Sequence, residues 1–117
     1  MPQRITKKYR RVDSTSVQGE GSFVEFAAPT FNDIVEFSSL IFENELEEVH
    51  DAEAIKLVMP MLERFVTHWN WVDDDGNPLP QPTEDSSVIQ QLTLEEQIFL
   101  VENLTRAFNL SEQTAKN

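Results

Sequence analysis

One stretch of the chain combines residue types that could bind a metal ion: the acidic turn after the second tryptophan. Asp73, Asp75 and Asn77 occupy the first, third and fifth positions of a calcium-binding loop, and Glu84 falls at the twelfth. Such a loop needs glycine at its sixth position for a sharp turn, and here that residue is Pro78. Because the proline ring fixes φ at about −65°, the sequence favours a plain polar turn over a calcium site.

The other reactive residue types in the chain offer little chemistry. The chain has no cysteine, which excludes disulfides, thiolate zinc sites and cysteine nucleophiles. The two histidines, His50 and His68, are far apart in the sequence, and no glycine-rich loop precedes a helix. The acids occur in runs such as Glu47-Glu48, whereas catalytic carboxylates usually need an apolar pocket that shifts their pKa. We therefore expect no enzymatic activity, no metal and no cofactor.

Charge is distributed unevenly along the chain. The 117 residues carry nine bases and 21 acids, a net charge of −12. Residues 12–117 hold four bases against 21 acids, a net of −17, because the first eleven residues hold no acid and five bases: Arg4, Lys7, Lys8, Arg10 and Arg11. So acidic a body repels nucleic acid and anionic membranes, and we expect neither as a partner. A role in solubility alone is the other interpretation of the acidity.

Two helices are expected in the first two thirds of the chain. Thr30 is a suitable N-cap for a helix whose apolar stripe covers residues 31–46. A second stripe with helical spacing runs through residues 55–69. Pro60 interrupts this second stripe, so we expect a kink or a new start of the helix there.

The remaining elements complete a helical fold. Residues 22–27 could form one short strand, and residues 73–80 must be a loop because glycine, asparagine and two prolines occur together. Thr83 can cap a short helix, and Thr93 with Glu96 forms a capping box for the last helix. We expect an all-α fold, a small bundle of three to four helices with flexible termini and at most one short N-terminal strand. Its parts would be a flexible basic arm (1–21), a helical domain (22–108) and a polar tail (109–117).

Large aromatic side chains are numerous for so small a helical domain. The candidates for a partner-binding surface are the seven that lie on or beside the apolar stripes: Phe31, Phe37, Phe42, Trp69, Trp71, Phe99 and Phe108. One interpretation is a core packed on more than one side. The other is an exposed groove that receives an apolar helix from another chain, and the two interpretations are compatible.

The most distinctive motif is a tryptophan pair followed by an acidic turn and a Pro-x-Pro exit, WNWVDDDGNPLP at residues 69–80. It lies between Ala-Pro-Thr-Phe at residues 28–31 and Gln-Leu-Thr-Leu at residues 91–94. Over residues 22–108 this pattern resembles the tail assembly chaperones of long-tailed bacteriophages. The basic residues 1–11 lie outside the resemblance, which leaves their role open.

The resemblance implies a function in the host cytoplasm. Such chaperones coat the tape measure protein, keep it soluble and pass it to the tail tube proteins, and a homo-oligomer is also compatible with this role. Apolar grooves would cover the client while the acidic exterior keeps the complex dispersed. Two alternatives stay open: a structural tail or neck component of the virion, and an acidic DNA-mimic inhibitor.

Overall fold

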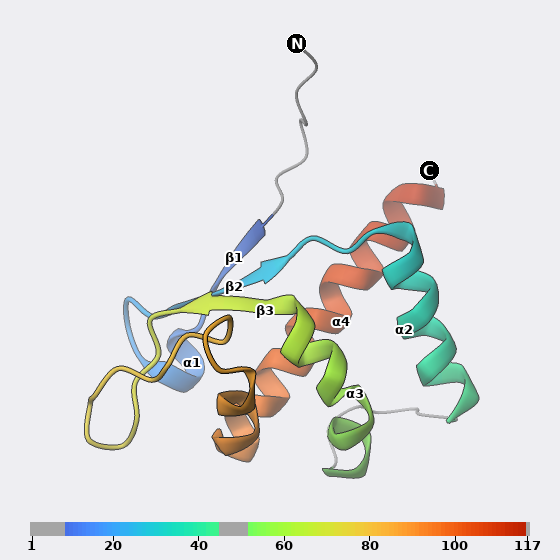
Figure 1. Ribbon diagram of the computed structural model, residues 1–117. Helices are drawn as coiled ribbons and strands as arrows, with labels where there is room; N and C mark the ends of the chain where they lie inside the picture. Colours follow the sequence, from blue (N-terminus) through green and yellow to red (C-terminus); the bar gives the residue numbers. More distant parts are fainter. Residues whose placement is uncertain (1–8, 45–51, 117) are drawn as a thin grey trace.

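The core of the fold is an antiparallel sheet covered on one face by helices. The computed structural model describes residues 9–44 and 52–116, and side-chain surroundings up to residue 108. Within these residues the strands β1 (Tyr9–Asp13), β2 (Phe23–Ala27) and β3 (Val66–Trp69) lie in that order, as Figure 1 shows. The chain is therefore a mixed helix-and-sheet protein.

The expectation of an all-α bundle is wrong. The short strand expected at residues 22–27 is present as β2, but it pairs with two strands that were not expected. Because residues 66–69 continue the apolar spacing of the preceding helix, the sequence pattern predicts that they belong to it. Their sequence, Val-Thr-His-Trp, is rich in β-branched and aromatic residues, and pairing with β2 outweighs the helical spacing.

The first hairpin uses part of the range expected to be a flexible arm. From Tyr9 onward this range contains β1, the short helix α1 (Thr15–Gln18) and a turn, whereas residues 1–8 lie outside the described part. Ser14 is fully buried, and its hydroxyl donates to the Ser22 hydroxyl across the base of the hairpin at 2.7 Å. This buried bond closes the hairpin where the alternating strand pattern ends.

In the described part of the chain, four helical elements follow the first hairpin. The chain continues through α2 (Phe31–Glu43), α3 (Ala52–Phe65), the 3-10 helix η1 (Ser86–Gln91) and α4 (Leu94–Lys116). α3 continues through Pro60 without ending. The capping box of Thr93 and Glu96 is confirmed, because the Glu96 amide donates to the Thr93 hydroxyl at 3.2 Å and the Thr93 amide donates to the Glu96 carboxylate at 2.9 Å. The cap of η1 is Asp85, not Thr83, because the Asp85 carboxylate accepts from the Ser87 amide.

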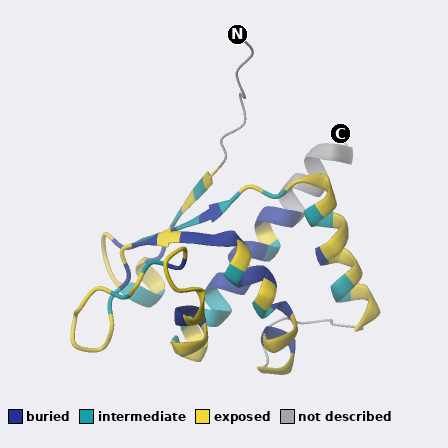
Figure 2. Cartoon of the chain, in the orientation of Figure 1, coloured by how far each residue is buried: buried dark blue, intermediate teal, exposed yellow. Residues whose placement is uncertain are grey.

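The hydrophobic core lies between the sheet and the helices α3 and α4. Val24 and Phe26 point to the same face of β2 and are almost fully buried. α3 and α4 pack together and present the other side of the core, which includes Val58, Leu62, Leu100, Val101 and Leu104. Figure 2 shows this buried layer, with α2 carrying mainly exposed and half-buried residues at the edge of the molecule.

Candidate protein-binding surfaces

The seven aromatic candidates divide into a buried and an exposed group. Phe37, Trp69, Trp71 and Phe108 are buried in the core, and Phe99 is half-buried against it. Phe31 and Phe42 are exposed, with 74% and 85% of their surface accessible. Of the seven candidates, the structure therefore leaves only the two on the outer face of α2 open to a partner.

The two tryptophans form a stacked pair inside the protein. Trp69 and Trp71 are two residues apart in extended chain, so their side chains lie on the same face. Their rings are parallel within 4° and their centroids are 4.8 Å apart. The indole nitrogen of Trp69 donates to the Pro80 carbonyl at 3.1 Å, and that of Trp71 donates to the Ser14 hydroxyl at 2.9 Å. Both polar groups are thereby satisfied in the core.

Three side-chain amides hold the backbone around the tryptophans. The Gln81 amide bonds both the N–H and the carbonyl of Trp69, at 3.0 Å and 2.8 Å. The Gln18 amide does the same for Val72, at 2.9 Å and 3.2 Å, and also donates to Glu96. The Asn70 amide accepts from the Phe23 N–H and donates to the Gly21 carbonyl. Each amide accepts from one backbone N–H and donates to one backbone carbonyl, as the backbone of a neighbouring strand does. The motif of residues 69–80 is therefore held by paired hydrogen bonds.

The acidic turn uses its first carboxylate to hold its own shape. The Asp73 carboxylate accepts from the amides of Asp75 and Asn77, both at 2.9 Å. The Asp73 amide donates to the Asn77 carbonyl, and Gly76 takes a positive φ of 81°. Among the described residues, no group of three or more carboxylates and histidines is arranged to hold a metal ion.

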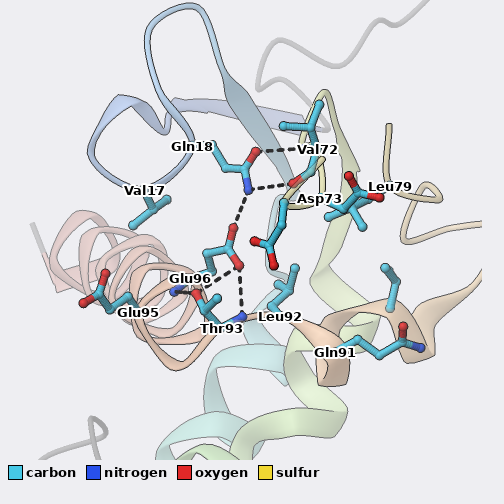
Figure 3. Close-up of a pocket in the computed structure, with 12 residues that line it drawn as sticks. Val17, Gln18, Val72, Asp73, Leu79, Gln91, Leu92, Thr93, Glu95 and Glu96 are labelled. Carbon is cyan, nitrogen blue, oxygen red and sulfur yellow. Dashed lines mark hydrogen bonds between the residues drawn. The ribbon is translucent and has the colours of Figure 1, made fainter. Parts of the chain in front are cut away.

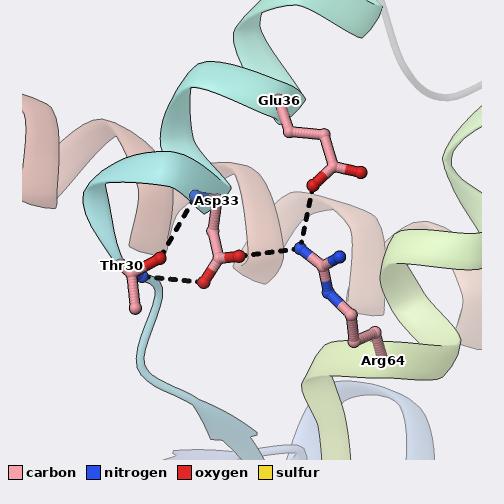
Figure 4. Close-up of polar contacts among 4 residues, drawn as sticks. All are labelled: Thr30, Asp33, Glu36 and Arg64. Atoms are coloured by element: carbon pink, nitrogen blue, oxygen red, sulfur yellow. Dashed lines mark hydrogen bonds and ion pairs between the residues drawn. The ribbon is translucent and has the colours of Figure 1, made fainter.

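Polar contacts fix the start of α2, as Figure 4 shows. Thr30 and Asp33 cap the helix reciprocally: the Thr30 amide donates to the Asp33 carboxylate at 2.8 Å, and the Asp33 amide donates to the Thr30 hydroxyl at 3.3 Å. Arg64 of α3 then donates to Asp33 at 2.8 Å and to Glu36 at 3.2 Å. The one guanidinium therefore ties α2 to α3.

The inner face of α2 meets the core through aromatic packing. The Phe37 ring lies edge-on to the Phe108 ring of α4, with centroids 4.6 Å apart, and Phe108 packs in the same way on Phe65 of α3. Leu40 and Ile41 add half-buried contacts beside Phe37. The helix thus buries the arc that contains Phe37, not the stripe that begins at Phe31.

The outer face of α2 carries an exposed apolar stripe of Phe31, Val35 and Phe42, which we call the α2 stripe. At about 100° per residue, these three positions fall within about 40° of one another around the helix axis. They extend over about 16 Å along it. Val35 is 47% accessible, and the intervening Ser38 and Ser39 are also exposed. The α2 stripe is therefore a narrow surface, interrupted by exposed serines, of a length that one partner helix covers.

A cleft of about 450 Å³ lies elsewhere on the molecule, between α1, the acidic turn, η1 and the start of α4. Figure 3 shows Asp73 and Glu96 facing each other across it, and Val17, Leu79 and Leu92 are among the residues that line it. Its lining holds four carboxylates and no basic residue. We call Val17, Leu79 and Leu92 the floor of the cleft, and its four carboxylates the rim. The cleft therefore combines an apolar floor with an acidic rim.

Comparison with known proteins identifies no relative. No protein-family model matches the chain, and searches of curated proteins and of solved structures find no significant match. In the described part of the chain, no helix has both the length and the apolar character needed to cross a membrane.

Proposed function

We propose that this chain is a non-enzymatic tail assembly chaperone of a long-tailed bacteriophage. It binds the tape measure protein in the host cytoplasm, keeps it soluble during tail assembly and transfers it to the tail tube proteins. The observation that carries the proposal is the α2 stripe, which exposes two phenylalanines on a protein whose other large aromatics are mostly buried. The resemblance of residues 22–108 to this family supplies the identity of the client.

The α2 stripe is strong enough to act as a binding surface. Full burial of a phenylalanine or valine side chain contributes about 1.5–3 kcal/mol. Phe31 and Phe42 are each about three-quarters or more exposed, so a covering helix would gain most of that energy at both ends of the stripe. Phenylalanine is among the residue types that are enriched at protein–protein interfaces.

Charge defines the kind of helix that fits. α2 carries the acids Asp33, Glu36 and Glu43 and no base, and among the described residues only Arg64 pairs with the first two. A client helix that combines an apolar face with flanking lysines or arginines is therefore complementary to this surface. The net charge of −12 on this chain favours a dispersed complex.

Co-expression tests the proposal. The client is the longest helical reading frame encoded near this chain, and the readout is its soluble fraction with wild-type chain, with F31S/F42S or with L94S. Leu94 is 52% accessible but lies on α4, so L94S is a matched control for loss of exposed apolar surface. We expect wild type and L94S to keep the client soluble and F31S/F42S to fail while remaining folded. Equal solubility with all three proteins would refute the α2 stripe as the client-binding surface.

Mass spectrometry of purified particles separates the proposal from the structural alternative. A chaperone leaves before the particle is complete, so the chain should be missing from mature virions. A fixed copy number in the particles would instead assign it to the tail or neck.

A further inference from the structure

The cleft beside the acidic turn has the features of a peptide-binding site. Val17, Leu79 and Leu92 are half-buried and line it without closing over it. Gln18 joins α1, the turn and the start of α4 through its bonds to Val72 and Glu96, so the walls are held at a fixed separation. A cleft of about 450 Å³ accommodates a few residues of extended chain.

None of the four rim carboxylates meets a basic residue among the described residues that line the cleft. Asp73 is used by its own turn, and Glu96 by the capping box and Gln18. Asp74 and Glu95 are exposed, and no hydrogen bond or ion pair joins either carboxylate to a residue in the described ranges. An occupant with an apolar side chain between two bases would therefore satisfy the floor and the rim together.

The chain itself contains such a segment. Residues 4–8, Arg-Ile-Thr-Lys-Lys, place one isoleucine between basic residues in the part of the sequence that lacks acids. The segment joins β1 at Tyr9, whereas the cleft lies near α1, beyond the other end of the strand. To reach its own cleft it would have to reverse at Tyr9 and run back along a strand about 16 Å long. A second copy offers the same cleft without that reversal.

We infer that the N-terminal segment 1–8 of one copy binds the acidic cleft of another copy, with Ile5 on the apolar floor and its flanking bases on Asp74 and Glu95. The contact is between unlike surfaces, so it closes into a dimer when two copies exchange segments and extends into a chain when they do not. Neither surface includes the α2 stripe, so the inference stands or falls independently of client binding.

A complementation experiment tests the inference on the full chain. R4E/K7E reverses the segment and leaves the cleft intact, whereas D74K/E95K reverses the cleft and leaves the segment intact. In analytical ultracentrifugation we expect wild type to exceed its 13.5-kDa monomer mass as concentration rises, and each variant alone to stay monomeric. A mixture of the two variants should form a one-to-one complex, because one supplies the cleft and the other the segment. Monomeric wild type, or no complex in the mixture, would overturn the inference.

The matched control makes the same change of net charge as D74K/E95K, but at two acids outside the cleft. D75K/E53K alters one acid in the same turn and one in the first turn of a helix, both outside the cleft lining. This control should self-associate like wild type, and its failure to do so would assign the effect to net charge alone.

A labelled peptide of residues 1–8 provides the direct binding measurement. It should bind R4E/K7E, and its affinity should fall at least about tenfold between low and high salt. Its affinity for R4E/K7E/D74K/E95K should be at least about tenfold lower than its affinity for R4E/K7E. If neither the salt concentration nor D74K/E95K changes the affinity, the peptide binds outside the cleft.

Discussion

The Gln18 side chain offers the sharpest test of how the tryptophan segment is held. Gln18 bonds both backbone groups of Val72 and the carboxylate of Glu96, and all three contacts are partly buried. Q18A leaves the N–H and carbonyl of Val72 without a protein partner. An unsatisfied buried group costs about 1–3 kcal/mol, and water in the adjacent cleft relieves part of this. We therefore expect Q18A to lower the free energy of unfolding by about 2 kcal/mol.

A second substitution at the same position separates lost bonds from charge. Q18E keeps an acceptor for the Val72 N–H, loses both donor contacts and places a carboxylate beside Glu96. The neighbouring negative charge raises the pKa of the introduced carboxyl, so its destabilising effect is present above that pKa and disappears as pH falls through it. Relative to Q18A at the same pH, Q18E should be less stable at pH 7, by about 1 kcal/mol, and should lose this deficit near pH 4.

Urea unfolding followed by tryptophan fluorescence measures both effects, because Trp69 and Trp71 are the only tryptophans and both are buried. Q91A is the control: Gln91 lines the same cleft but is exposed, so its loss should change stability by less than about 0.5 kcal/mol. If Q18A is as stable as Q91A, the amide bridge does not hold the segment and the account of the motif fails.

Three further predictions concern α2 and the acidic turn. R64A removes the tie to Asp33 and Glu36, so hydrogen exchange within α2 should accelerate while global stability falls by about 1 kcal/mol or less; unchanged exchange would contradict the tie. F37A empties the contact with Phe108 and should lower the free energy of unfolding by about 3–4 kcal/mol in urea, and a loss below about 1 kcal/mol would mean that α2 is not anchored there. Millimolar calcium should shift the melting temperature by less than about 1 °C, because the Asp73 carboxylate holds its own turn; a larger, saturable rise would reveal a site.

The sequence predicts individual helix starts better than it predicts the overall fold class. The capping residues Thr30 and Thr93 mark real helix starts, because a hydroxyl followed by an acid three residues later satisfies amides within one turn. Residues 66–69 were misassigned because their apolar spacing fits a helix as well as a strand, and only pairing with β2 decides between them. β1 was missed because basic residues obscure its alternation, in which only Val12 is apolar on the inner face.

The candidate surface could be only partly predicted, for a related reason. The sequence shows that α2 is apolar on more than one side, but it does not show which side meets the core. Phe37 lies off the stripe of Phe31, Val35 and Phe42, and yet Phe37 is the residue that the core receives, through Phe108. The cleft was not predicted at all, since its walls come from α1, the acidic turn and α4, which are far apart in the sequence.

Hydroxyl-radical footprinting of the client complex can show whether the client covers the α2 stripe. Phe31 and Phe42 are accessible in the free chain, so we expect both to be oxidised, as we do for the exposed Leu94 on α4. When the tape measure protein is bound, we expect a several-fold decrease in oxidation at both phenylalanines and no change at Leu94. A complex in which both phenylalanines stay as reactive as in the free chain would show that the α2 stripe is not where this protein binds its client.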